Sequence, residues 1–325
     1  MRNMKPLIYI NGASALSVQD TLYGCNPNAF VRYRSGFVPA LDPDFKEHIP
    51  IMAARRMSRI IKRAVTVSQL ALRQAEVVLP DAIIFGTGLG CMEDTEKFLN
   101  AVLDQEEELL QPAFFIQSTH NTIAAQVAMR LECRGYNNTF VQRTLSFESA
   151  LLDAYMLFQE GRVQSVLTGG HDELTPSYYR LLDKAGYYTH GFAGEGSTSF
   201  VLSNRPCAGS YAVIQGLEMR YFPHHHVAFT DVALPFLQKL EVSPEELGAI
   251  FTADYEVISC SDTLADIPQF PCREWCGEFF TASAFALWQA AHYLRSGYLS
   301  KPYILLHNHA QNKHHSLILL KHINS

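Results

Sequence analysis

The 325-residue chain lacks several features that mark whole classes of protein. It has no basic excess, because 26 lysines and arginines face 32 aspartates and glutamates, and this disfavours nucleic-acid binding. No apolar run approaches the roughly 20 residues that span a bilayer, and the N-terminal stretch favours a first strand over a signal peptide. Seven cysteines without a CxxC pair favour neither a disulfide framework nor a zinc ribbon. We therefore expect a cytoplasmic protein with free thiols.

Hydrophobic residues make up 48% of the chain, which is enough for a large core. Strand-like and helix-like patterns alternate along the chain, and this alternating series starts again in the second part of the sequence. Such a pattern is typical of an α/β fold in two halves. The expected strands are 7–11, 81–85, 139–142, 165–168, 198–202, 211–217, 249–252, 303–307 and 316–320; the expected helices are 51–76, 95–107, 147–159, 232–240 and 279–295. We predict an N-terminal half at 1–207 and a shorter C-terminal half at 208–325, with a hairpin across 204–206.

Glycine and histidine clusters suggest ligand sites at first sight. The glycines in 86–90 follow a strand and precede a helix, but their GxGxG spacing favours a tight structural turn over a phosphate cradle. Histidines cluster at 224–226 and again at positions 307, 309, 314 and 315. No carboxylate lies within the second tract to complete a ligand set, so we expect no metal site and no cofactor.

A run of basic residues stands out in this acidic protein. It consists of Arg55, Arg56, Arg59, Lys62 and Arg63. On a helix, positions 55, 59, 62 and 63 would share one side and form a positive strip. The strip is either a dock for an acidic partner or an ordinary solvated face.

The segment 134–170 has the layout of a catalytic strand-turn-helix. An apolar-edged strand meets a sharp turn of small residues, a long helical run follows, and the next strand ends in Gly169 and Gly170. A nucleophile is expected at the turn, yet the residue there is Thr144.

This segment resembles the core of the β-ketoacyl synthases, the thiolase-fold condensing enzymes of fatty acid and polyketide synthesis. In that family a nucleophilic cysteine follows a turn glycine by nine positions and precedes the second glycine of a Gly-Gly pair by twenty-six, which are here Gly135, Thr144 and Gly170. Asn121 and the stretches "RRMSRI", "FAGEGSTSFVL" and "EFFTASAFALWQAAHYLRSGYL" resemble further family motifs, so the resemblance covers nearly the whole chain. It implies two stacked mixed β-sheets with buried and flanking helices in αβαβα layers.

The resemblance also implies that the reactive residues are gone. Such synthases use a cysteine thiolate and two histidines. Here Thr144 takes the cysteine position, Asp254 the first histidine, and Gly277 or Glu278 the second. A threonine hydroxyl does not ionise near neutral pH without a base, and carboxylates repel a developing enolate.

Two residues near the turn are the fallback candidates for chemistry. Ser146 follows the turn closely, although an N-cap role explains it more simply. His120 lies in the segment before the turn but has no evident nucleophile to activate. An acyl-carrier-protein (ACP) transferase or hydrolase that uses Ser146 or His120 is therefore the first alternative function.

The family includes chain-length factors, which lack the nucleophilic cysteine and pair with an active ketosynthase. The chain resembles the compact members in aryl-polyene and flexirubin-type pigment clusters. This implies a non-catalytic subunit that pairs with an active β-ketoacyl-ACP synthase and binds ACP, with the basic strip as the dock. A homodimeric acyl-binding module is the second alternative, and the chain is short enough to leave a closed acyl tunnel in question.

The resemblance also implies where the partner binds. In ketosynthases the strand that enters the nucleophile turn pairs across the dimer axis, and the preceding segment borders both acyl pockets. These stretches are 137–142 and 115–121 in this chain. The residues expected at the pocket and dimer interface are Phe115, Gln117, Thr119, Asn121 and Gln142.

Overall fold

The computed structural model describes residues 7–104, 112–310 and 313–324, and its strands form one mixed sheet. The strands are β1 (Ile8–Leu16), β2 (Ala82–Gly86), β3 (Tyr136–Phe140), β4 (Ser165–Asp172), β5 (Gly196–Ser203), β6 (Ala212–Tyr221), β7 (Leu247–Thr252), β8 (Gln269–Pro271), β9 (Tyr303–Ala310) and β10 (His314–Lys321). The helices are α1 (Ile51–Ala54), α2 (Arg59–Gln74), α3 (Met92–Asp104), α4 (Pro112–Ser118), α5 (Thr122–Leu131), α6 (Ser146–Gln159), α7 (Pro176–Lys184), α8 (Phe229–Lys239), α9 (Asp262–Ala265), α10 (Arg273–Cys276) and α11 (Ala282–Arg295).

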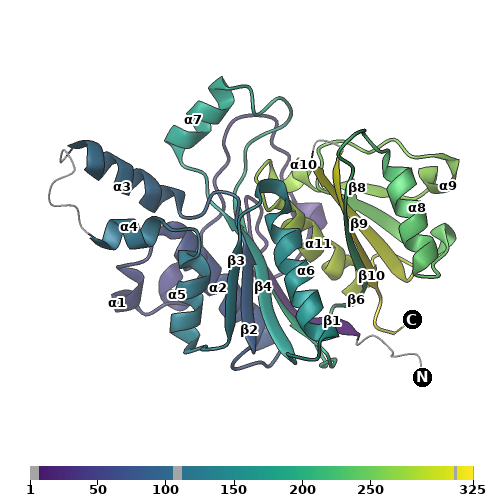
Figure 1. Ribbon diagram of the computed structural model, residues 1–325, viewed down its shortest axis with the longest axis horizontal. Helices are drawn as coiled ribbons and strands as arrows, with labels where there is room; N and C mark the ends of the chain where they lie inside the picture. Colours follow the sequence, from purple (N-terminus) through teal and green to yellow (C-terminus); the bar gives the residue numbers. More distant parts are fainter. Residues whose placement is uncertain (1–6, 105–111, 311–312, 325) are drawn as a thin grey trace.

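The sheet consists of two halves, which lie side by side in Figure 1, and both have the same strand order. The first half runs β3-β2-β4-β5-β1, and the second repeats this order as β8-β7-β9-β10-β6. In each half one strand, β2 or β7, lies between two parallel neighbours. The last strand of each half along the chain, β5 or β10, pairs antiparallel with both of its neighbours. Antiparallel pairing of β1 with β6 joins the halves into one sheet. The expected α/β organisation in two related halves is therefore present.

The connection between the halves differs from the sequence-based expectation. β5 and β6 do not form the predicted hairpin, because each pairs with β1, which lies between them. The N-terminal strand is buried along most of its length and bonds to a neighbour on both edges. The division between residues 207 and 208 stays a prediction.

Two helices lie inside the fold, between the two halves of the sheet. α6 and α11 contact each other and strands of both halves. α11 is mostly apolar and is buried on all sides from Ala282 to Ala291, as expected for a helix inside the fold, and its Phe285 and Trp288 are almost completely buried. Phe147 at the start of α6 belongs to the same core cluster. This inner layer fixes the start of α6, and with it the turn at Thr144.

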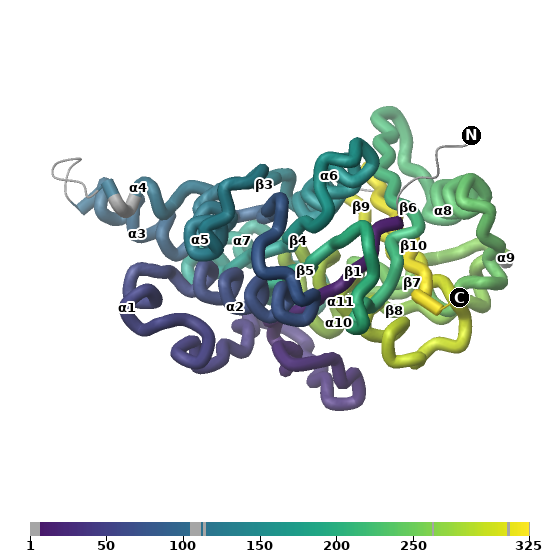
Figure 2. The backbone as a smooth tube through the Cα atoms, turned by 90° about the horizontal axis from the view of Figure 1, so that it is seen from below, coloured from purple at the N-terminus to yellow at the C-terminus, as the bar shows by residue number. Residues whose placement is uncertain are grey.

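The outer face of the first half is covered by α2 and α5, which pack on its strands and on each other (Figure 2). A Cβ atom at Gly12 would lie 2.0 Å from the carbonyl oxygen of Ala71, so this close approach of α2 to β1 requires glycine. The expected single helix 51–76 is two helices, because Ser58 has extended backbone angles and a new helix begins at Arg59.

α3 and α4 lie side by side and project from the body of the molecule (Figure 1). The predicted helix 95–107 corresponds to α3, and its last three predicted positions lie outside the described residues. Within the described ranges, no helix has both the length and the apolarity to cross a bilayer.

Candidate functional site

The turn that leads into α6 has the predicted strand-turn-helix geometry. After β3 ends at Phe140, Arg143 adopts a left-handed backbone with φ of 52°. The single-turn helix Arg143–Leu145 then leads directly into α6. A left-handed non-glycine residue is uncommon and costs about 1 kcal/mol or more, and such conformations cluster at functional turns. Thr144 follows the strained residue and is half-buried.

The hydroxyl of Ser146 is committed to holding this turn together. It donates a hydrogen bond to the carbonyl oxygen of Arg143 at 2.7 Å and accepts one from the backbone N–H of Gln142 at 2.8 Å. The side chain is fully buried, and the N-cap of α6 is Leu145, so the N-cap expectation for Ser146 is wrong. His120 is exposed and lies against Gly90. Among the described residues, no hydrogen bond links His120 to either hydroxyl of the turn.

Four charged or polar side chains gather at the positions where the resemblance predicts the family's two histidines. Asp254 follows β7, and its Oδ2 lies 3.1 Å from Nε2 of His309 on β9. The guanidinium of Arg273 lies 3.1 Å from Glu278 and 3.7 Å from Asp254. Sequence reasoning placed Asp254 and Glu278 here but missed Arg273 and His309.

The electrostatics of this cluster depend on Arg273, which is nearly buried. Burial raises the pKa of Asp254, but the hydrogen bond from His309 and the charge of Arg273 outweigh it and hold the pKa below its usual value. Burial dominates at Glu278 and raises its pKa despite Arg273. The cluster is therefore a salt-bridged set with two carboxyl groups, which cannot stabilise a developing enolate as two histidines would.

The alternative position, Gly277, has no room for a side chain. Its φ is 77°, and a Cβ atom there would lie 2.6 Å from the ring of Phe192. Glu278 is consequently the residue that presents a functional group at this point of the site. The ionic partner of Glu278 is Arg273. Its only signal in the sequence was an arginine between two cysteines, Cys272 and Cys276.

A second contact ties β9 to the turn. The side-chain nitrogen of Asn308 donates to the carbonyl oxygen of Thr144 at 2.8 Å and to Oε1 of Glu148 at 2.6 Å. Glu148 is completely buried, and burial raises its pKa to about 7. Glu148 and Asn308 line one small cavity together with Ser283 and His307.

The glycine-rich turn at 86–90 is closed by the protein itself. The backbone N–H groups of Gly88 and Leu89 donate to one carboxyl oxygen of Asp172, at 2.8 and 3.1 Å. The other oxygen accepts from the backbone and hydroxyl of Thr281, each at 2.9 Å. An internal carboxylate thus occupies the position of an anion, which agrees with the structural interpretation of this turn.

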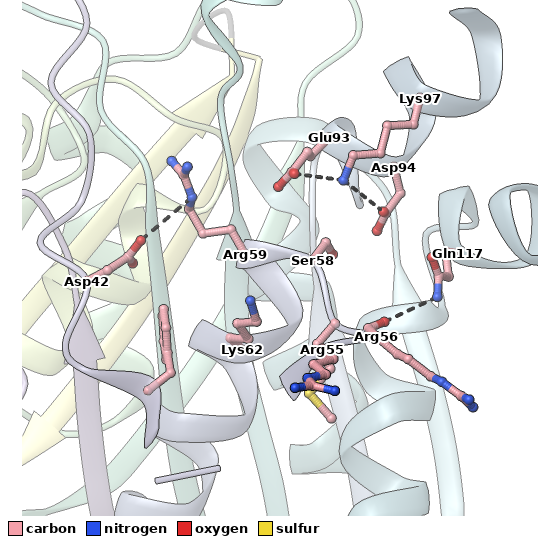
Figure 3. Close-up of a pocket in the computed structure, with 12 residues that line it drawn as sticks. Asp42, Arg55, Arg56, Ser58, Arg59, Lys62, Glu93, Asp94, Lys97 and Gln117 are labelled. Carbon is pink, nitrogen blue, oxygen red and sulfur yellow. Dashed lines mark hydrogen bonds and ion pairs between the residues drawn. The ribbon is translucent and has the colours of Figure 1, made fainter. Parts of the chain in front are cut away.

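The basic residues lie around an open hollow between α1, the start of α2 and the start of α3 (Figure 3). Its volume is about 570 Å³, and it is lined by Asp42, Phe45, Arg55, Arg56, Met57, Ser58, Arg59, Lys62, Glu93, Asp94, Lys97 and Gln117. Arg55, Arg56 and Arg59 are exposed and Lys62 is half-buried. Arg59 lies 3.7 Å from Asp42, whereas Arg55 and Lys62 form no ion pair with any described residue.

Arg63 does not belong to this surface, and its assignment to the exposed strip is corrected. Its side chain is fully buried, with ion pairs to Asp42 at 2.5 Å and to Glu195 at 2.8 Å. The reason is the rotation of α2, which turns position 63 towards the sheet while position 59 stays in solvent. Arg63 therefore stabilises the fold and is not available to a partner.

The expected interface residues are divided between two places. Phe115 is 58% exposed on α4 and packs against Phe98, and Gln117 donates to the carbonyl oxygen of Arg56 at the basic hollow. Thr119 donates to the carbonyl oxygen of Ile116, and Asn121 is exposed at the start of α5. Gln142 lies at the nucleophile turn instead, where its side-chain oxygen accepts from Ser149.

Solved structures with the same architecture define the fold class. A type II polyketide synthase acyl-carrier protein in complex with its ketosynthase aligns with a TM-score of 0.79 at 14% identity, over 98% of this chain and 100% of that chain. The ishigamide ketosynthase/chain length factor gives 0.79 at 18% identity, over 98% and 99%. The ketosynthase ApeO with its chain length factor ApeC from Xenorhabdus doucetiae gives 0.71 at 15% identity, over 99% of both chains. The predicted thiolase-like fold is confirmed.

The family follows from the sequence. A family model described as the N-terminal domain of β-ketoacyl synthase matches residues 37–205, just over half of the chain. The chain belongs to the β-ketoacyl synthase family, as predicted.

Curated relatives match a smaller part. The 3-oxoacyl-[acyl-carrier-protein] synthase 2 of Synechocystis sp. (strain ATCC 27184 / PCC 6803 / Kazusa) is 27% identical over 145 residues, which is 42% of this chain and 35% of the relative. The enzyme of the same name from Staphylococcus aureus (strain N315) is 24% identical over 133 residues, 39% of this chain and 32% of the relative. The match thus spans about a third of the length of these relatives.

Proposed function

We propose that this protein is a non-catalytic ketosynthase-like subunit of the chain-length-factor type, which pairs with an active β-ketoacyl-ACP synthase. The observation that carries the proposal is a nucleophile turn kept in shape without a nucleophile. Arg143 is strained and α6 starts at the turn, yet the residue presented is Thr144. Asp254 and Glu278, at the positions expected for the two histidines, pair with Arg273 instead.

The hydrogen bonds of the turn argue against substitute chemistry. Ser146 is buried and bonded on both sides, and His120 contacts neither hydroxyl. A hydroxyl nucleophile needs an adjacent base within hydrogen-bond reach. These contacts favour the partner-subunit function over the transferase or hydrolase alternative.

The exposed surface near the turn supports a subunit interface. β3 is the end strand of the sheet, and an unpaired edge of this kind is a liability unless another chain covers it. Large apolar side chains are exposed along this edge: Tyr136 and Val141 on and just after β3, and Met129, which lines a hollow together with Asn137. Two of the similar structures are described as pairs of a ketosynthase and a chain length factor, which is the kind of assembly proposed here.

The same proposal assigns the basic hollow to ACP, whose surface is strongly acidic. The hollow presents four cations, those of Arg55, Arg56, Arg59 and Lys62. Among the described residues, only Arg59 of these four has an ion-pair partner, Asp42. Several exposed cations together raise affinity and association rate in a salt-dependent way. Fatty acid, polyketide or polyene pigment synthesis in the cytoplasm is the setting that we propose.

Co-purification and mass spectrometry test this function together. The tagged chain, expressed in its native host, is expected to retain a ketosynthase that carries its own nucleophilic cysteine. Incubation with acyl-ACP should leave the intact mass of this chain unchanged, and Thr144→Cys alone should not restore condensation of malonyl-ACP. A stable acyl adduct on Thr144 or Ser146, or a chain that never binds a ketosynthase, would contradict the proposal.

A further inference from the structure

The free edge of β3 can be oriented residue by residue. Within the described chain β3 pairs only with β2, in parallel. The carbonyl oxygen of Phe140 accepts a hydrogen bond from the N–H of Thr87 at 3.0 Å, just beyond β2, so Phe140 faces β2. Because successive residues of a strand direct their N–H and C=O groups to opposite sides, Asn137, Thr139 and Val141 direct theirs outward.

The middle N–H of this free edge is already bonded. The backbone N–H of Thr139 donates to the side-chain oxygen of Asn138 at 2.9 Å. The amide nitrogen of Asn138 donates to the hydroxyl of Tyr136 at 3.2 Å, and that hydroxyl donates to Asp153 on α6 at 3.0 Å. We call Asp153, Tyr136 and Asn138 the edge cap. Each bond has a consistent donor and acceptor, so the chain fixes the direction of the Asn138 amide.

Pairing with a second copy of this chain would open the edge cap twice. In an antiparallel pair, outward-facing residues exchange N–H and C=O bonds with the partner strand. Any two-fold pairing that overlaps Thr139 therefore needs its N–H in both copies. A strand from a different chain needs it in one copy only.

Positive charge at both ends of β3 also disfavours pairing with a second copy of this chain. Arg134 and Arg143 lie before and after β3, are exposed, and form no ion pair with any described residue. Antiparallel approach of two copies brings the end of one strand to the start of the other, and thus arginine near arginine. Like charges that face each other across a strand pair are destabilising.

We propose that the edge cap directs β3 away from a second copy of this chain and toward a strand of a different ketosynthase-fold chain. The inference rests on the proposed function, since it deepens the choice of partner. The strand that fits bonds to Asn137 and Val141 and carries neutral or acidic residues opposite Arg134 and Arg143. Specificity of this kind comes from a penalty on the wrong partner as much as from contacts to the right one.

Self-association of edge-cap variants tests the inference. Sedimentation equilibrium of the purified full chain should show weak self-association, and Asn138→Ala should tighten it roughly tenfold or more, because two hydrogen bonds no longer have to be broken. Tyr136→Phe removes only the anchor of the Asn138 amide and should give a smaller change in the same direction. Asn137→Ala is the matched control, since that side chain points to α5, where it donates to Ala124, and takes no part in the edge cap.

Thermal melting of each variant confirms that it is folded before association is measured. A wild-type chain that is already a tight homodimer through Val141, detected by cross-linking of Val141→Cys, would overturn the inference. Equal association constants for wild type, Asn138→Ala and Tyr136→Phe would overturn it too. Binding to a ketosynthase is measured separately, so the two proposals can be told apart. The inference about the edge cap can be wrong although a ketosynthase binds, and it can be right although no ketosynthase binds.

Discussion

Glu148 provides the sharpest quantitative prediction. It is completely buried, its neighbours are Asn308, Ser283, His307 and the charge of Arg273, and burial raises its pKa from 4.5 to about 7. A carboxyl group with a higher pKa in the folded state binds its proton more tightly there. It therefore stabilises the folded state fully below pH 4.5, and this contribution is lost as the pH rises to about 7.

The size of the effect follows from the two pKa values. One pKa unit corresponds to about 1.4 kcal/mol, so a rise from 4.5 to about 7 corresponds to about 3 kcal/mol. Glu148→Gln keeps the acceptor for Asn308 and carries no charge at any pH. Relative to wild type, the variant should gain about 3 kcal/mol in free energy of unfolding between pH 4.5 and 8.

Urea denaturation of both proteins across this pH range measures the difference. Buried histidines also titrate with folding, since burial lowers the pKa of His307 to about 3, but they contribute equally to both proteins and cancel. Glu160→Gln, on the exposed end of the same helix, is the control and should run parallel to wild type. The reasoning is wrong if the Glu148→Gln curve also runs parallel to wild type, or if the variant loses stability relative to wild type as the pH rises. Either result would mean that the carboxyl group of Glu148 is ionised in the folded protein.

Other predictions concern binding and stability. Reversal of Arg55 and Arg59 to Glu should weaken ACP binding in low-salt titrations, and unchanged affinity would leave these residues as a solvated face. Arg63→Gln should instead lower the free energy of unfolding in urea by about 3 kcal/mol, because it leaves the buried carboxylate of Glu195 without its ionic partner. Ser146→Ala should cost about 1–2 kcal/mol in the same assay without any change in partner activity. Thr119→Trp should shorten the products of a reconstituted ketosynthase pair, as judged by mass spectrometry; unchanged lengths would remove this residue from the pocket.

Local patterns in the sequence were enough for the fold class and the family. Alternating strand and helix periods gave most of the elements, and the spacing from Gly135 through Thr144 to Gly170 located the turn, because a strand-turn-helix is formed by neighbouring residues. The predicted loss of the nucleophile rests on one residue of the sequence, Thr144. Glycines at 86–90 were correctly interpreted as a turn, although nothing in the sequence identified Asp172 as its partner.

Only the tertiary structure decided which residues meet. Arg59 and Arg63 are four positions apart on one helix, yet one is exposed and the other buried, because the sheet lies against α2 at an angle that helical spacing does not reveal. Asn308 reaches Thr144 and Glu148 across about half of the chain, and this depends on β9 passing beside the turn. The sequence by itself led to the prediction that the catalytic residues are replaced. The packing of the two halves determined what now fills the site, because contacts between distant segments have no local signature.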